Sequence, residues 1–148
     1  MTAQKLDGTA TATAIKGELI ARVAALKAAG ITPGLGTVLV GDDPGSRWYV
    51  NGKHKDCAEV GIFSETFRLP ETSTHQEVLA LIASLNADDR FHAILPQLPM
   101  PKQIVEQEVI DAMLARKDAD GLHPVNLGRL LRGELDGVPE IPCGGIRR

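Results

Sequence analysis

Short apolar runs between helical patterns most constrain the fold of this chain. Thr37–Val40 is uniformly apolar or β-branched, and Phe91–Leu95 is a second short run of mainly apolar residues. Such runs are typical of strands covered on both faces, as in a parallel sheet. Ile62–Leu69 alternates like a strand and ends at Pro70. We therefore expect three strands, of which Thr37–Val40 and Phe91–Leu95 are buried.

Helical patterns separate these runs. The predicted helices span 7–30, 46–60, 74–86 and 104–114, with a short helical turn at 127–131. The first carries apolar residues at helical spacing, namely Ile15, Leu19, Ile20, Val23 and Leu26. Helices alternating with apolar strands predict an α/β fold in which a mostly parallel sheet lies between two helical layers. A length of 148 residues suits a single domain.

Composition excludes several classes of protein. The chain is 43% hydrophobic, enough for a sizeable core, and its net charge of -3 gives no basic field for nucleic acid or anionic lipid. It has no apolar run of about 18 residues and no signal-type N-terminus, so we expect no membrane span. Two widely separated cysteines indicate a reduced, cytoplasmic protein.

The ends of the predicted strands are where a ligand should bind, because open α/β sheets bind ligands beyond the carboxyl ends of their strands. These segments are 41–46, 96–101 and 118–124. Tyr49 and Lys53 follow the first, four residues apart on one helical face. A ring beside an amine suits a flat substrate and a proton transfer. Taken alone, the pair is better explained as a core-edge tyrosine and a solvated lysine.

Other motifs do not match known sites. Gly34-Leu-Gly36 precedes a strand, and Leu39 stands where a dinucleotide fingerprint needs its third glycine. Asp118–Gly121 lacks the remaining ligands of a calcium loop. His54 and Cys57 have no second ligand pair with zinc spacing. We therefore expect neither a phosphate cradle nor a metal site.

A set of motifs resembles one enzyme family over nearly the whole chain. They are Leu6–Gly8, Val38–Pro44 with Ser46, Tyr49-Val50-x-x-Lys53, Cys57–Gly61, Leu69-Pro70, Leu85-Asn86, Gln97–Pro101, Lys117–Pro124 and Asn126–Leu130. In this order they are similar to the N-terminal catalytic domain of the bifunctional methylenetetrahydrofolate dehydrogenase/methenyltetrahydrofolate cyclohydrolase. The resemblance implies folate one-carbon chemistry, with tetrahydrofolate derivatives as substrates.

The resemblance also implies roles for single residues. Lys53 matches the catalytic lysine, and Tyr49 matches the ring that stacks on the folate. Gln97 matches the amide that orients this lysine, and Asp120 the carboxylate that binds the pterin's amino and ring N–H groups. Without the resemblance, Gln97 would be interpreted as a loop amide and Asp120 as a residue that forms a turn.

The chemistry suits these residue types. A pterin is flat with an amino-pyrimidinone edge, so it fits an aromatic platform and an acceptor-only carboxylate. A desolvated lysine beside a cationic substrate has its pKa lowered, and a neutral amide holds it without reversing that shift. Ser46, one turn before Tyr49, and Pro99, within the Gln97–Pro101 motif, complete the expected substrate contacts.

The resemblance breaks at the end of the chain. Residues 1–141 match the folate-binding domain, whereas 142–148 form a glycine- and arginine-containing tail in which Gly144-Gly145 replaces the family's Thr-Pro. The family continues into an NADP-binding domain, so we expect a frameshifted or partial chain that binds no NADP alone and performs no hydride transfer. Family members are commonly homodimers. The alternative is a non-catalytic fragment, at most a weak folate-binding module.

Overall fold

The computed structural model describes residues 7–134 of the chain. The N-terminal and C-terminal segments, including the predicted divergent tail 142–148, lie outside the described residues. The elements in chain order are α1 (Gly8–Ala28), β1 (Gly34–Val40), α2 (Pro44–Val60), β2 (Phe63–Leu69), α3 (His75–Ala87), β3 (Ala93–Pro96), α4 (Glu106–Asp111), the 3-10 turn η1 (Ala115–Lys117) and α5 (Pro124–Leu131).

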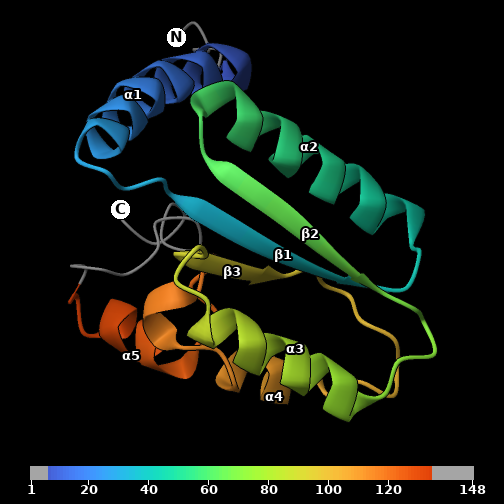
Figure 1. Cartoon of the computed structure of the whole chain (residues 1–148). Helices are drawn as coiled ribbons and strands as arrows, with labels where there is room; N and C mark the ends of the chain where they lie inside the picture. The colour runs from blue at the N-terminus through green and yellow to red at the C-terminus, as the bar shows by residue number, and fades with distance from the viewer. Residues whose placement is uncertain (1–6, 135–148) are drawn as a thin grey trace, which may run out of the picture.

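The three strands form one parallel sheet in the order β2-β1-β3. β1 lies in the centre, with Gly34 opposite Phe63 and Val38 opposite both Phe67 and Pro96. Helices α1 and α2 lie on one side of the sheet, and α3, α4 and α5 lie on the other (Figure 1). This arrangement confirms the predicted α/β fold with a parallel sheet between helical layers.

The main core lies between the sheet and the layer of α3 and α4. It is built from buried aliphatic and aromatic side chains: Val38, Val40, Val78, Ile82, Leu85, Phe91, Ile94, Ile104, Val109, Ile110 and Met113. Phe91 is fully buried and packs edge-on against Phe67 at 5.4 Å between ring centroids. Burial of this size supplies most of the favourable free energy of folding, and it fixes β1 and β3, whose ends carry the site.

Two glycines of β1 are explained by close packing. A Cβ on Gly34 would overlap the backbone carbonyl oxygen of Arg90, and one on Gly36 would come within 3.3 Å of the Phe91 ring. Gly34 therefore needs the smallest side chain, whereas a methyl group at Gly36 would require the Phe91 ring to shift by a few tenths of an ångström. This packing accounts for the Gly-x-Gly pattern without any phosphate ligand.

The predicted first helix is confirmed as α1, but most of its apolar residues are not buried. Of its apolar residues only Val23 is buried, while Ile15, Ile20 and Leu26 are exposed. Helix α1 packs chiefly on α2 rather than on the sheet, so only a narrow line of it is covered. Lys16 joins the two helices through ion pairs with Asp56 (2.6 Å) and Glu59 (2.7 Å).

Helix α4 is shorter than the predicted helix 104–114. The Leu114 N–H donates to the Asn86 side chain at 2.9 Å instead of to a carbonyl one turn earlier. Met113 already bonds to Ile110 with the tighter spacing of a 3-10 turn. A side chain of α3 therefore ends α4. Within residues 7–134 no helix has the length and apolar character needed to cross a membrane.

Candidate active site

Helix α2 begins directly after the carboxyl end of β1. Gly41 turns the chain with a φ of 84°, and the Asp43 side chain then accepts the Ser46 N–H at 2.7 Å as the helix N-cap. Pro44 occupies the first helical turn, where its missing N–H costs nothing. This start fixes the rotation of α2, and with it the direction in which Lys53 leaves the helix.

Lys53 is hydrogen-bonded to Gln97 across the carboxyl edge of the sheet. The Lys53 Nζ donates to the Gln97 Oε1 at 3.0 Å, and both side chains are partly buried. The other end of the amide is fixed as well, because Gln97 Nε2 donates to the Leu98 carbonyl at 2.8 Å. Gln97 follows β3, and its N–H bonds to Val38 of β1 at 2.8 Å. The amide thus holds the lysine without adding a negative charge.

Asp120 lies near Lys53 and comes from a third segment of the chain. The chain after η1 runs beside β3, where Asp118 forms a bridge with Ile94 and the Ala119 N–H donates to the Ile94 carbonyl at 3.1 Å. Burial raises the pKa of the Asp120 carboxyl, the nearby Lys53 ammonium opposes this shift, and the Asp118 charge adds to it. Asp120 is therefore close enough to Lys53 for their charges to interact.

A buried polar network, which sequence reasoning missed, holds the Asp120 loop. The Asp118 carboxylate accepts hydrogen bonds from the Gly121 N–H (2.9 Å), the His123 N–H (2.9 Å) and the Asn126 amide (2.8 Å). Asp118 and Asn126 are both buried. An aspartate that bonds to the backbone three residues later is a turn signal, and Asp118 before Gly121 was such a signal.

Lys117, next to Asp118, points towards the end of α3 instead. Its buried ammonium donates to the carbonyls of Leu85 (3.0 Å), Asn86 (2.9 Å) and Asp88 (2.8 Å) at the end of α3. A cation at this position satisfies carbonyls that the helix leaves open and complements the helix dipole. The Lys117–Pro124 motif therefore contains structural residues as well as Asp120.

Tyr49 and Ser46 occupy contrasting environments on α2. The Tyr49 side chain is 57% exposed and packs edge-on against the Trp48 ring at 5.1 Å between centroids. The Ser46 hydroxyl is buried and has no hydrogen-bond partner among the described residues; it lies near the Asp43 carboxylate without meeting hydrogen-bond geometry. A buried hydroxyl without a partner is costly, and a substrate contact by Ser46 stays a prediction.

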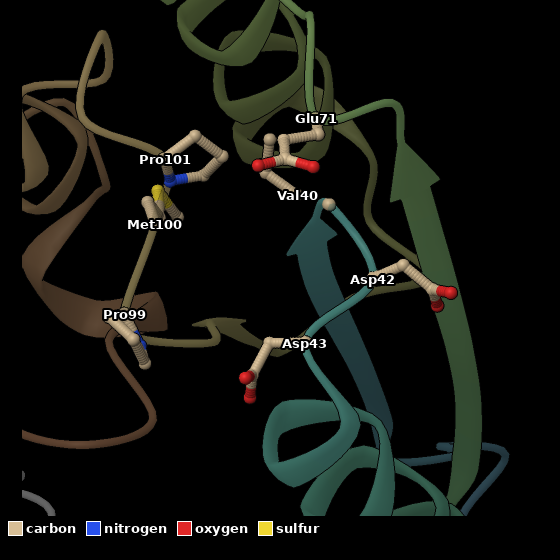
Figure 2. Close-up of a pocket in the computed structure, with 8 residues that line it drawn as sticks. Val40, Asp42, Asp43, Glu71, Pro99, Met100 and Pro101 are labelled. Atoms are coloured by element: carbon tan, nitrogen blue, oxygen red, sulfur yellow. The ribbon is translucent and has the colours of Figure 1, made fainter.

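Pro99 lines a neighbouring hollow of about 370 Å³ between the ends of β1 and β3. Its other lining residues are Val40, Gly41, Asp42, Asp43, Glu71, Met100 and Pro101. Figure 2 shows Pro99 and Asp43 on opposite sides of the opening. The hollow and the Lys53–Gln97 pair share this edge of the sheet, but Lys53, Gln97 and Asp120 do not line the hollow. The structure therefore brings together Lys53, Gln97 and Asp120, with Pro99 to one side.

The Gly-x-Gly pattern and the possible metal ligands can be checked directly among residues 7–134. Arg90 and Phe91 occupy the space beside Gly34 and Gly36 of β1, so these glycines leave no room for a phosphate. No group of three or more histidine, cysteine, aspartate or glutamate side chains in residues 7–134 is placed to hold a metal ion. An amine, an amide and a carboxylate instead lie beyond the ends of parallel strands, where open α/β sheets bind small molecules.

Comparison with known proteins identifies the family. A profile described as "Tetrahydrofolate dehydrogenase/cyclohydrolase, catalytic domain" matches residues 6–120, more than half of the chain. The chain therefore belongs to the tetrahydrofolate dehydrogenase/cyclohydrolase family. The bifunctional protein FolD of Geotalea daltonii is 51% identical over 142 residues, a match that covers 96% of this chain and 51% of the relative.

Solved structures agree with this assignment. The bifunctional FolD methylenetetrahydrofolate dehydrogenase/cyclohydrolase of Campylobacter jejuni superposes with a TM-score of 0.91 at 43% identity, covering 95% of this chain and 50% of that one. The dehydrogenase-cyclohydrolase of Trypanosoma brucei, solved with NADP and an inhibitor, has a TM-score of 0.84 at 36% identity and covers 88% and 45%. The chain thus spans about half the length of these relatives.

Proposed function

We propose that this chain is a folate-binding catalytic domain that hydrolyses 5,10-methenyltetrahydrofolate to 10-formyltetrahydrofolate. The observation that carries the proposal is the Lys53–Gln97 hydrogen bond, with Asp120 near enough to Lys53 for their charges to interact. Family membership supports the choice of substrate. Tyr49, on the same helical face as Lys53, offers the platform for the flat ligand.

The proposed chemistry assigns a proton transfer to Lys53. Water attacks the cationic methenyl carbon while the amine of Lys53 accepts one of its protons. The carbinol formed then collapses: the bond from carbon to N5 breaks, Lys53 returns its proton to N5, and the hydroxyl proton leaves as the formyl group forms on N10. One water is consumed and one proton is released. Gln97 holds the amine in place, and Asp120 binds the pterin edge.

The direct test follows the loss of methenyltetrahydrofolate absorbance with purified protein. We expect hydrolysis above the uncatalysed rate, together with a rise in the melting midpoint when 5-formyltetrahydrofolate is added, because a ligand of the folded state stabilises it. A cooperative melt with a ligand shift but no hydrolysis would support a folate-binding module instead. No ligand shift and no hydrolysis would overturn the proposal and favour a non-catalytic fragment.

Asp120→Asn is expected to stabilise the protein while weakening folate binding. The folded state binds the Asp120 proton more tightly than the unfolded state, because the pKa is raised. The stability from this carboxyl is complete below its unfolded pKa and is lost as pH rises through the folded value. At pH 7 the variant should therefore melt at a higher temperature than the native protein, and this difference should disappear near pH 4.

Folate affinity of the same variant should fall about tenfold or more, since a hydrogen bond to a charged group contributes roughly 1.5–3 kcal/mol. Calorimetric titration with 5-formyltetrahydrofolate measures the loss. Asp89→Asn, which changes an exposed aspartate in the turn before β3, is the control and should alter neither property. Unchanged affinity in Asp120→Asn would remove Asp120 from the substrate site.

We assign no hydride transfer to residues 7–134. The oxidation step and NADP binding belong, in our proposal, to the longer relatives, one of which was solved with NADP. Assembly as a homodimer and a cytoplasmic location stay predictions from family membership. The hydrolytic half is separable in principle, because it uses water and no nicotinamide.

A further inference from the structure

The loop after β3 carries two of the expected site residues but has few backbone hydrogen-bond donors of its own. Gln97 and Pro99 lie in it, and the nitrogens of Pro99 and Pro101 carry no hydrogen. Met100 therefore supplies the only N–H of the stretch Pro99–Pro101. The partner of this one N–H decides how firmly the backbone beside Gln97 is held.

The partner is a carboxylate at the start of α4. The Met100 N–H donates to the Glu106 Oε1 at 2.7 Å, and the contact is partly buried. A hydrogen bond to a carboxylate is shorter and stronger than one between neutral groups. Glu106 is the first residue of α4, where a negative charge also suits the positive end of the helix dipole. It thus joins the loop to a helix whose Val109 and Ile110 are buried in the main core.

The other side of the loop faces open space. Residues 99–101 line the hollow of about 370 Å³ at this edge of the sheet (Figure 2). The Met100 side chain packs against the main core. Among the described residues, however, the nearest backbone-to-backbone hydrogen bonds lie at the two ends of the loop, where the Gln97 and Ile104 N–H groups donate. The Glu106 carboxylate therefore holds the middle of a loop that otherwise has room to move.

We propose that Glu106 is a positioning residue for the Lys53–Gln97 pair. This inference rests on the proposed function, in which Lys53 carries the proton. The direction of the Gln97 amide depends on the loop backbone, because the amide bonds both to the Lys53 amine and to the adjacent Leu98 carbonyl. A shift of the loop moves that amide, and a misplacement of about 1 Å can lower a rate about 10²-fold. Glu106 acts on Lys53 only through the Met100 backbone and Gln97.

Two conservative variants separate the length of this side chain from its charge. Glu106→Asp keeps the negative charge at the start of α4 but is one methylene shorter, so its carboxylate stops short of the Met100 N–H. Glu106→Gln loses the charge but keeps an oxygen at full length. We expect kcat for methenyltetrahydrofolate hydrolysis to fall about tenfold in Glu106→Asp, as for loss of a hydrogen bond to a charged group, and to stay within about threefold of native in Glu106→Gln. KM should change little in either, because the contact positions the amine and not the substrate.

Glu108→Asp is the matched control. Glu108 lies on the same helix, and its carboxylate bonds to the His75 Nε2 at 2.8 Å instead of to the loop, so its shortening loosens α4 without touching Met100. We expect native kcat from it. In a Gln97→Ala background, Glu106→Asp should cause no further loss, because the residue through which it acts is gone. An equal loss in both backgrounds, or an equal loss in Glu108→Asp, would overturn the proposal.

Amide hydrogen exchange, measured by NMR, reports the contact without any substrate. The Met100 amide should exchange about tenfold faster in Glu106→Asp than in native protein or Glu106→Gln, while the Ile104 amide, bonded to the Pro101 carbonyl at 2.9 Å, should not change.

The two readouts separate this inference from the proposed function. Faster Met100 exchange in Glu106→Asp, without hydrolysis by the native protein, supports the hold on the loop and overturns the proposed function. Native hydrolysis with an unchanged kcat in Glu106→Asp, whatever its exchange rate, overturns the positioning role of Glu106 and leaves the proposed function standing.

Discussion

Lys53→Ala is expected to lower methenyltetrahydrofolate hydrolysis about 10²–10⁴-fold, the usual contribution of a positioned acid–base group. The variant retains α2, because Lys53 is not part of the buried core, and alanine favours helix. The loss should therefore appear in kcat, with the melting temperature nearly unchanged. Initial rates of absorbance loss over a range of substrate concentrations measure it.

Lys55→Ala is the matched control for this experiment. Lys55 lies two residues further along α2 and is exposed, so its replacement removes the same charge without touching Gln97. We expect native activity from it. Gln97→Ala should give an intermediate loss, because it frees the Lys53 amine without deleting it. Equal rates in native protein and Lys53→Ala would exclude Lys53 as the proton carrier.

Gly34→Ala is expected to destabilise the fold by about 3 kcal/mol, at the upper end for overpacking a tight site. The added methyl group would overlap the Arg90 carbonyl oxygen. The two segments cannot separate easily, since the Gly34 N–H donates to the His92 Nδ1 at 3.2 Å and the Gly34 carbonyl accepts the His92 N–H at 2.8 Å. A loss of this size is a large fraction of ordinary domain stability.

Gly17→Ala makes the same chemical change where space is free. Gly17 lies within α1, and a Cβ there meets nothing within 4 Å. Alanine should stabilise the helix by about 0.5–1 kcal/mol. Urea denaturation of both variants compares the free energies of unfolding. A neutral Gly34→Ala variant would mean that the start of β1 yields more readily than its hydrogen bonds imply.

Pattern reasoning predicted the sheet because its signals are local. Thr37–Val40 and Phe91–Leu95 were recognisable as buried strands without any tertiary information, and β1 and β3 overlap both. The extent of helices was less predictable. Helix α4 ends early because a side chain from α3, Asn86, takes the Leu114 N–H. Helix α1 leaves most of its apolar residues exposed because it packs on a helix and not on the sheet.

The site was predictable only in part, for a related reason. Residue types and a family resemblance pointed to Lys53, Gln97 and Asp120, and the structure places these side chains at one edge. No periodicity connects Asp118 with Asn126, eight residues away, although their hydrogen bond holds the Asp120 loop. Nor does the sequence indicate that Arg68 of β2 would stand beside Arg47 of α2. Contacts between distant segments depend on the folded geometry.

The neighbours Lys117 and Asp118 point in opposite directions, one into the end of α3 and the other into the Asp120 loop. Lys117 closes the 3-10 turn η1 and Asp118 follows it in extended backbone, so adding or deleting one residue here would shift both side chains away from their partners. Each buried charged group would then lose hydrogen bonds, at a large cost in stability. This stretch should therefore tolerate conservative replacement far better than any alteration of its length.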